Sequence, residues 1–334
     1  MFQVSNPRFA KGIVTFPFSG IVSDFCKFCT FLLFISMARN DIIIKNIDIR
    51  GEIMSYKTTD GLMRHLRDNG ISIGGSIQKR QLMNTGYFHG YKGYRFFNNP
   101  SHCLPFTSYD EVYATVQYDT KLKALFYEKV MFIETAVKNY ALECILKIDN
   151  SESIQAMYDK AVCGFNNAEP TATREEKKKY QQRKLRLEST IQSYLSTAYI
   201  KDNPKITHFY NRMSYSGVPI WALFEIMTMG DIANLLSCLT FDARDAISQK
   251  LGIHDPSIDT NRELIYKYLY TIKDLRNAIA HNNVIFDTRF RTMDPSNAMK
   301  LFLKQKVGLP YINFKTITDY LILVCYYLKA LGKR

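Results

Sequence analysis

Apolar side chains recur every three or four residues along most of this chain, which is the spacing of one helix face. The longest such stretch covers residues 112–148 and follows a capping box made by Ser108 and Glu111. Around Asp119-Thr120 it is expected to bend, or to divide into two helices in series. No run alternates between apolar and polar residues over a useful length, as a half-buried strand does. The pattern therefore predicts an all-α fold.

Shorter helices follow from the same spacing and from residues that start or stop a helix. Gly70 is expected to stop the first, because glycine readily adopts the left-handed conformation found after a helix end. Pro219 is expected to open a later helix, since proline is favoured in the first turn, and Gly230 to close it. The shorter helices are expected at residues 58–69, 77–84, 219–229 and 311–331, with a helical hairpin arm at 231–251.

A helix near the C-terminus carries a continuous apolar stripe from Leu264 to Ile279. Thr260 and Glu263 have the spacing of a capping box and predict its start. Asn282-Asn283 predicts its end, because asparagine competes for backbone hydrogen bonds and tolerates left-handed geometry. Between these limits the helix has roughly five turns.

The last turn of this helix holds the residues with the clearest chemical potential. Histidine can move a proton near neutral pH, and arginine can hold a phosphate through a fixed fork of donors. Arg276 and His281 together offer the proton shuttle and the charge stabiliser that RNA cleavage by an internal 2′-hydroxyl requires without a metal. The alternative is a solvated helix end with a capping histidine. A second pair, Arg95 and His102, straddles Pro100 and is predicted to lie in a loop.

The spacing of the two residues has a geometric consequence. On a straight helix Arg276 and His281 point about 140° apart. They can meet at one phosphate only if the helix ends or bends there, or if a second copy of the chain supplies part of the site. One such motif per chain therefore predicts a homodimer, with two Arg–His sets facing each other across a groove.

The charge balance points to a polyanionic partner. The chain has 44 Lys and Arg against 31 Asp and Glu, a net charge of +13, with a pI near 9.3. Such a balance attracts polyanions and accelerates their capture. RNA is the expected partner, and an anionic membrane surface is the second choice.

Basic residues are concentrated between residues 174 and 186, where seven cations accompany two acidic residues. This strip is either an RNA-backbone contact or a solvated helix face. The candidate RNA-binding residues in it are Lys177, Lys178, Lys179, Arg183, Lys184 and Arg186.

A second candidate for RNA contact is the run from Gly86 to Phe97, in which seven of twelve residues have aromatic rings when His89 is counted. Aromatic rings beside cations can stack on single-stranded bases, and Tyr91, Lys92 and Arg95 are the candidates here. The alternative is a core cluster that pins two helices together, with the glycines allowing close approach.

The seven cysteines form no paired framework. Cys26 and Cys29 are separated by two residues, but no second pair or nearby histidine completes a zinc site. The other five are expected to be small buried residues: Cys103, Cys144, Cys163, Cys238 and Cys325. This usage predicts a reducing, cytoplasmic location and no metal or cofactor.

Residues 1–53 differ in character from the rest. The apolar run 25–37 has 13 residues and contains Lys27, so it is shorter than the roughly 20 residues that span a bilayer. As a signal peptide it lacks an Ala-x-Ala-like cleavage site. A third hypothesis is that translation begins at Met54 and that residues 1–53 are an over-extended start. An N-terminal peptide of the native protein that maps upstream of Met54 would contradict it.

Several blocks of the sequence, in order, resemble the abortive-infection AbiD/AbiF-like proteins of bacteria. Two departures are the extension 1–53, which has no counterpart, and Thr85–His89, which stands where those proteins have Asn-Tyr-Tyr-Arg. The matching blocks are residues 58–70, 82–91, 113–123, 133–138, 219–230 and 275–281.

That family is similar to HEPN domains, helical nucleases whose Arg-x4–6-His motif cleaves RNA as a dimer without metal. The resemblance implies that Arg276 and His281 carry catalysis, with Asn277 as the polar partner of the arginine. It implies an antiphage endoribonuclease, some relatives of which are thought to work with a small structured RNA. The expected domains are a helical subdomain at 54–107 and a HEPN-like helical domain at 108–334.

Two other functions remain open from the sequence. The first is a non-catalytic RNA-binding protein of a defence system, with the same fold and basic surface. The second is a membrane-associated toxin in which the apolar run 25–37 enters the bilayer. Cell fractionation of a chain that starts at Met54 tests the toxin hypothesis, because that chain lacks the run on which membrane association would depend.

Overall fold

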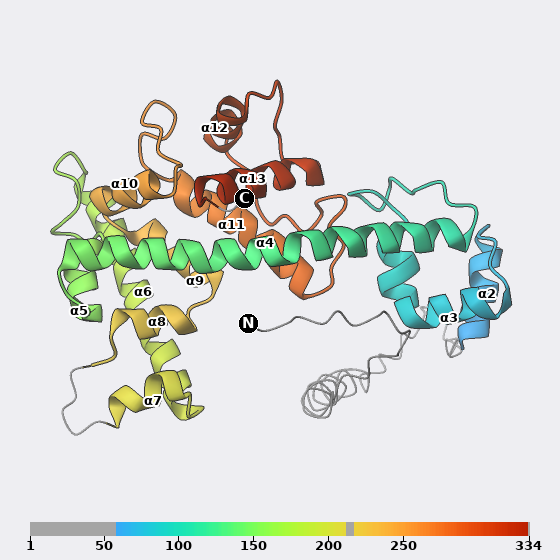
Figure 1. The fold of residues 1–334 in the computed structure, drawn as a ribbon, viewed down its shortest axis with the longest axis horizontal. Coiled ribbons are helices and arrows are strands. Elements are labelled where there is room, and N and C mark those ends of the chain that lie inside the picture. Colours follow the sequence, from blue (N-terminus) through green and yellow to red (C-terminus); the bar gives the residue numbers. More distant parts are fainter. Residues whose placement is uncertain (1–57, 212–216, 333–334) are drawn as a thin grey trace, which may run out of the picture. The chain divides into compact units, whose positions relative to one another are not determined.

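One long helix, α4 (Tyr109–Asp149), is the backbone of the fold (Figure 1). The computed structural model describes residues 58–211 and 217–332, so the extension 1–53 and its two cysteines lie outside the described residues. The predicted capping box is confirmed: Ser108 accepts a hydrogen bond from Glu111 N, and the Glu111 side chain accepts one from Ser108 N. The helix runs for 41 residues without a break at Asp119-Thr120. Neither residue interrupts it: Asp119 bonds to other parts of the chain, and Thr120 bonds to the carbonyl of Val116 one turn earlier.

The remaining regular structure in the described ranges is also helical, and the only β-type pairings there are isolated bridges. The all-α prediction is therefore confirmed. In chain order the elements are α2 (Thr59–Asp68), α3 (Gly75–Thr85), the π-helix η1 (Tyr87–Lys92), α4, α5 (Ile154–Ala156), the π-helix η2 (Met157–Ala161), α6 (Arg174–Ile200), α7 (Pro204–Tyr210), α8 (Ile220–Ile226), α9 (Met229–Cys238), α10 (Phe241–Lys250), α11 (Leu264–Ala280), α12 (Asn297–Val307) and α13 (Ile317–Ala330).

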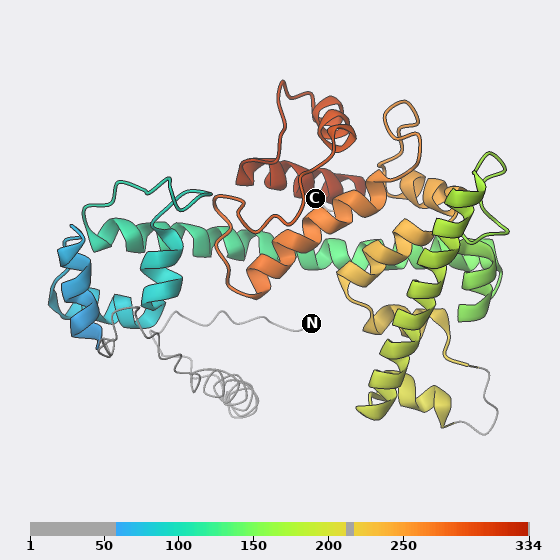
Figure 2. The ribbon, with the colours of Figure 1, turned by 180° about the vertical axis from the view of Figure 1, so that it is seen from behind.

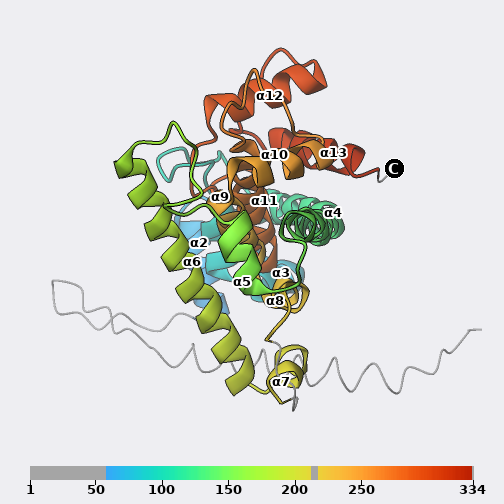
Figure 3. The same cartoon turned by 90° about the vertical axis from the view of Figure 1, so that its left-hand side faces the viewer.

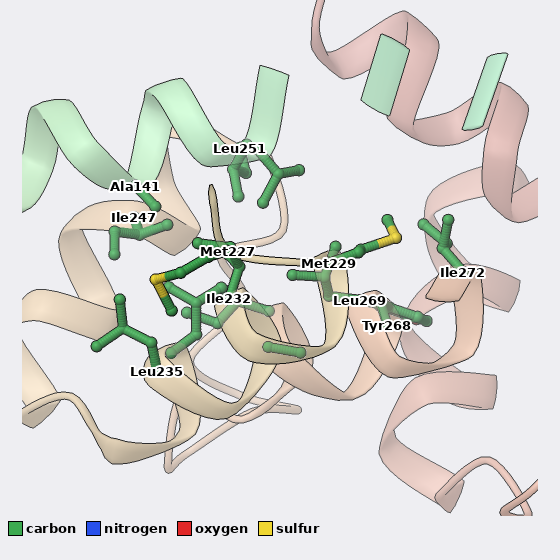
Figure 4. Packing of buried hydrophobic residues seen from close by; sticks show 14 of the residues in the cluster. Ala141, Met227, Met229, Ile232, Leu235, Ile247, Leu251, Tyr268, Leu269 and Ile272 are labelled. Carbon is green, nitrogen blue, oxygen red and sulfur yellow. The ribbon is translucent and has the colours of Figure 1, made fainter. Parts of the chain in front are cut away.

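The main core forms where α11 packs on α9, α4 and α10. Figure 3 shows α4 end-on, with α10, α11 and α13 grouped around it. The α11 stripe predicted from the sequence faces this core, and Tyr268, Leu269 and Ile272 are buried there in one cluster with Ile232 of α9 and Ile247 of α10 (Figure 4). Burying a large apolar side chain contributes about 1.5–3 kcal/mol, so this contact fixes α11 firmly.

A second, smaller cluster lies at the N-terminal end of α4. Met63 and Leu66 of α2 and Leu82 of α3 pack there against Tyr109 and Val112 of α4. Gly70 adopts a φ of 81° after α2, as expected of the residue that stops that helix. Because α4 contributes to both clusters, it joins the N-terminal helices to the main core within one compact unit, Thr59–Arg334.

The second long helix, α6, meets α7 near its C-terminal end and packs on α9 (Figure 2). It begins with a capping box between Thr173 and Glu176, which satisfies the otherwise unpaired N–H groups of the first turn. Only four of its side chains are fully buried: Leu187, Ile191, Leu195 and Ala198. Its first three turns, which hold the basic strip, contribute no buried residue.

Two predicted helix boundaries are wrong. Gly230 does not close α8; that helix ends at Ile226, and Gly230 lies in the first turn of α9, which Thr228 caps. Thr260 does not cap α11. The buried carboxylate of Asp259 accepts hydrogen bonds from Glu263 N and Leu264 N instead, at 2.8 and 2.9 Å. A charged acceptor bonds helix N–H groups more strongly than a hydroxyl, which explains the choice.

The C-terminal region also differs from the prediction. The last helix begins at Ile317 rather than Tyr311, because the Asp319 carboxylate accepts hydrogen bonds from Asn313 N and Phe314 N and holds that segment in an irregular turn. The pattern of apolar residues did not predict α12. The expectation that all five cysteines are buried holds for Cys144 and Cys238, whereas Cys163 is partly buried and Cys103 and Cys325 are exposed. The predicted loop around Pro100 is confirmed.

A buried acid at the end of α4 makes stability depend on pH. Asp149 is fully buried, and neither of its carboxylate oxygens has a hydrogen-bond partner in the described part of the chain. Burial raises its pKa from 3.8 to about 6. The folded state therefore favours the protonated acid, and its contribution to stability is greatest below pH 4 and is lost as the pH rises to about 6.

We expect Asp149→Asn to raise the free energy of unfolding by about 2–3 kcal/mol at pH 7.5 and by only about 1 kcal/mol at pH 4.5. Asparagine keeps the shape of the side chain but has no proton to lose. Urea denaturation at both pH values measures the difference, and Asp110→Asn, at an exposed position of the same helix, is the control. An equal effect of Asp149→Asn at the two pH values would refute this assignment.

Candidate functional site

The C-terminal end of α11 presents His281 to solvent. Asn282 N donates to the carbonyl of Ile279 at 3.1 Å, and Asn283 N donates to that of Ala278 at 2.8 Å. Asn282 has a φ of 54°, in the left-handed region. These bonds form a Schellman ending, so the predicted stop at Asn282-Asn283 is confirmed. His281 is the last residue before the turn, and its side chain is exposed.

Arg276, one and a half turns earlier, is held by a buried acid of α4. Its Nε lies 3.2 Å from Oε2 of Glu134, whose side chain is 9% exposed. The other carboxylate oxygen lies 3.5 Å from Nζ of Lys138, which also donates to the carbonyl of Met227 at 2.5 Å. These two ion pairs offset the cost of burying the carboxylate. Glu134 therefore holds the guanidinium of Arg276 at its Nε side.

The outer end of the same guanidinium remains available. Its Nη1 lies 3.4 Å from Oδ1 of Asn277, and the Arg276 side chain is 32% exposed. A guanidinium has five N–H donors, and these two contacts use two of them. The other three have no protein partner within the described ranges. This geometry leaves a positive, oriented fork at the surface, as a phosphate-binding arginine requires.

Glu134 was missed as a site residue, although its sequence context carries a signal. It stands between Ile133 and Val137 on the buried stripe of α4. A carboxylate in such a stripe needs a partner, because burying an unpaired charge is costly. The sequence does not say which cation supplies the partner, because Arg276 lies 142 residues further along the chain.

A buried polar network fixes the segment that follows His281. Asp119 of α4 is fully buried, and its Oδ1 accepts hydrogen bonds from Ile285 N at 3.0 Å and Phe286 N at 2.8 Å. Its Oδ2 accepts one from the Tyr94 hydroxyl at 2.6 Å and lies 2.9 Å from Nζ of Lys123. The network thereby ties α4, the residues after η1 and the segment after α11 together.

The basic strip lies on the first three turns of α6. Lys178, Lys179, Arg183 and Arg186 are exposed, which suits contact with a nucleic-acid backbone. Lys177 is partly buried. Lys184 is tied inward, since its Nζ donates to the carbonyl of Tyr158 at 2.6 Å. No hydrogen bond or ion pair joins the strip to Arg276, Asn277 or His281 within the described ranges, so the structure does not assemble these residues into one site.

The aromatic candidates divide between core and surface. Tyr91 is 9% exposed and belongs to the N-terminal cluster, which favours the core alternative for this residue. Lys92 lies over the rings of Tyr87 and Phe88, at 5.5 and 5.2 Å from their centroids. Phe88 is 74% exposed, and Arg95 is partly exposed. Stacking by this segment stays a prediction.

The described residues show neither a metal-binding cluster nor a membrane-spanning helix. They contain no group of three or more His, Cys, Asp or Glu side chains arranged to hold a metal ion. None of their helices is both long and apolar enough to cross a bilayer.

The site residues lie inside a region that matches a known family. The profile of the Abi-like protein family matches residues 80–287, which is more than half of the chain and includes Glu134, Arg276 and His281. No curated protein and no solved structure matches the chain. The match confirms the resemblance to abortive-infection proteins seen in the sequence blocks. The chain belongs to the Abi-like protein family.

Proposed function

We propose that this protein is a HEPN-type endoribonuclease that acts in abortive infection, a role to which its Abi-like family points. One observation carries the proposal: α11 ends with an exposed His281 one and a half turns after Arg276, whose guanidinium is oriented by Glu134 and keeps unpaired donors at the surface. The pair offers proton transfer and charge stabilisation at one end of one helix.

The proposed reaction uses the RNA's own 2′-hydroxyl as the nucleophile. Its oxygen forms a bond to phosphorus while the bond from phosphorus to the 5′-oxygen breaks. His281 accepts the 2′-hydroxyl proton or donates one to the leaving 5′-oxygen. Arg276 stabilises the charge that develops on the phosphoryl oxygens, and Asn277 orients the phosphate or the histidine. The products carry a 2′,3′-cyclic phosphate and a 5′-hydroxyl.

Two proton transfers per turnover favour a homodimer. A single histidine cannot hold both the base form and the acid form at the moment of the displacement. Two chains with their α11 ends facing each other across a groove supply both forms, His281 from one protomer and His281 of the partner subunit. Sedimentation equilibrium with and without RNA measures the oligomeric state.

Incubation of the purified protein with RNA in EDTA tests the reaction. We expect fragments with 2′,3′-cyclic phosphate ends from the wild type. Fragments with 3′-hydroxyl ends, formed only when a divalent metal is added, would contradict the proposed mechanism.

Glu134 has a positioning role in this scheme. We expect Glu134→Gln to lower the cleavage rate about tenfold, because the neutral amide holds the arginine less firmly. In an Arg276→Ala background the same change should have little further effect, as a double-mutant cycle would show. Glu143→Gln, at an exposed position of α4, is the matched control. Equal effects of Glu134→Gln in both backgrounds would mean that Glu134 does not act through Arg276.

A non-catalytic RNA-binding role is the second candidate, and the exposed cations of α6 favour it. It predicts that Arg276→Ala combined with His281→Ala retains phage protection. Sequencing of RNA that co-purifies with the wild type and with His281→Ala also separates the two. One abundant structured RNA in both would indicate a stable RNA partner, whereas heterogeneous fragments with the wild type alone would indicate a free-standing nuclease.

A further inference from the structure

A polar cavity of about 270 Å³ lies beside the end of α11. Three separate stretches form it: the end of α3 with η1, the N-terminal part of α4, and Asn282, the residue directly after His281. The first two coincide with sequence blocks 82–91 and 113–123, to which the proposed chemistry assigns no role. The lining residues are Asn84, Thr85, His89, Tyr94, Tyr113, Val116, Gln117, Thr120 and Asn282.

Some of the lining groups are already engaged. The Thr85 hydroxyl donates to the carbonyl of Gln81, and the Tyr94 hydroxyl donates to Asp119. The amides of Asn84 and Gln117 and the ring of His89 have no hydrogen bond to any residue that the structure describes. These three groups can both donate and accept hydrogen bonds.

Lys123 fixes the orientation of a fourth group, the Asn282 amide. Nζ of Lys123 donates to Oδ1 of Asn282 at 2.9 Å. An ammonium group has donors only, so the amide oxygen must face Lys123. The Nδ2 group of Asn282 then remains as a donor on the residue adjacent to His281.

The chemistry of the lining indicates which part of an RNA would enter. No lysine, arginine, aspartate or glutamate lines the cavity, so a neutral ligand matches its lining better than a phosphate does. Side-chain amides match the mixed donors and acceptors on the edge of a nucleobase, and the rings of Tyr113 and His89 offer faces for stacking. The volume lies just below the range of about 300–1,000 Å³ that holds drug-sized ligands, so the cavity has room for a nucleobase.

We propose that this cavity binds a single unpaired nucleobase of the RNA, next to the phosphodiester bond that is cleaved at His281. The base is selected by hydrogen bonds from Asn84, Gln117 and Asn282. The inference rests on the proposed function, since it supplies a specificity subsite for that RNA. Sequence-specific RNA recognition commonly uses bases splayed out of single strands in this way.

The test measures binding rather than cleavage. The His281→Ala protein is titrated, at one fixed salt concentration, with four homopolymeric RNA oligonucleotides of six nucleotides, one for each base. We expect at least about a tenfold preference for one base, which Gln117→Ala and Asn84→Ala each reduce to about threefold or less. Gln192→Ala, the same change at an exposed position of α6 outside the cavity, should keep the full preference.

Several outcomes would overturn the proposal: equal affinities for the four oligonucleotides, no binding of any, or a preference that survives both cavity substitutions. Because the assay uses a protein with the proposed catalytic histidine removed, it does not depend on the nuclease proposal. A wild type that keeps the base preference but does not cleave RNA contradicts the nuclease alone. A wild type that cleaves without any preference contradicts the subsite alone.

Discussion

Replacing His281 by alanine is expected to lower the rate of RNA cleavage by about 10²–10⁴-fold, because general acid–base catalysis contributes that much. The melting temperature should stay within about one degree, since the His281 side chain is exposed and surface changes of this kind have small effects. Single-turnover cleavage of a labelled RNA and thermal denaturation measure the two quantities.

The matched control for this substitution is His102→Ala, at another exposed histidine, in the loop after η1. It should leave cleavage unchanged. If His102→Ala lowers the rate as much as His281→Ala, the exposed histidines act only through general RNA affinity, and the assignment of His281 fails.

Replacing Asp119 by alanine is expected to have the largest effect on stability, about 3–5 kcal/mol, because it leaves Lys123 as an uncompensated buried charge. The change also leaves the backbone N–H groups of Ile285 and Phe286 without their acceptor. Urea denaturation at pH 7.5 measures the loss. Asp110→Ala, at an exposed aspartate of the same helix, should change the free energy of unfolding by about 0.5 kcal/mol or less.

The Asp119 variant also bears on the site. The network holds Lys123 against Asn282, so its loss should loosen the turn that presents His281. We expect faster amide hydrogen exchange at Asn282 and Asn283 in a variant that remains folded, such as Asp119→Asn. Unchanged exchange there, with stability lowered, would mean that Asp119 supports the fold without supporting the site.

The sequence was sufficient to predict the helices whose packing face is continuous. Residues 112–148 and 264–279 each keep an apolar stripe over several turns, and both form helices close to the predicted bounds. The end of α11 at Asn282-Asn283 was also predictable, because a left-handed turn suits asparagine. Local signals of this kind depend on few residues, which is why they can be read from one chain.

Features that depend on distant contacts were not predictable. Asp119 suggested a bend or break in α4, but it serves as an inward acceptor for groups more than 160 residues away. The pairing of Glu134 with Arg276 and the cavity lined by three separate stretches of the chain have the same origin. A competing local signal explains the wrong start of α11, where Asp259 rather than Thr260 caps the helix.

The most direct test of the central claim is cleavage of an RNA with one 2′-deoxy substitution at a mapped cleavage site. If the neighbouring 2′-hydroxyl is the nucleophile, that bond should resist cleavage by the wild type, while other mapped bonds in the same molecule are cut at their usual rates. Cleavage of the substituted bond at the rate of the all-ribose RNA would contradict the proposed roles of Arg276 and His281.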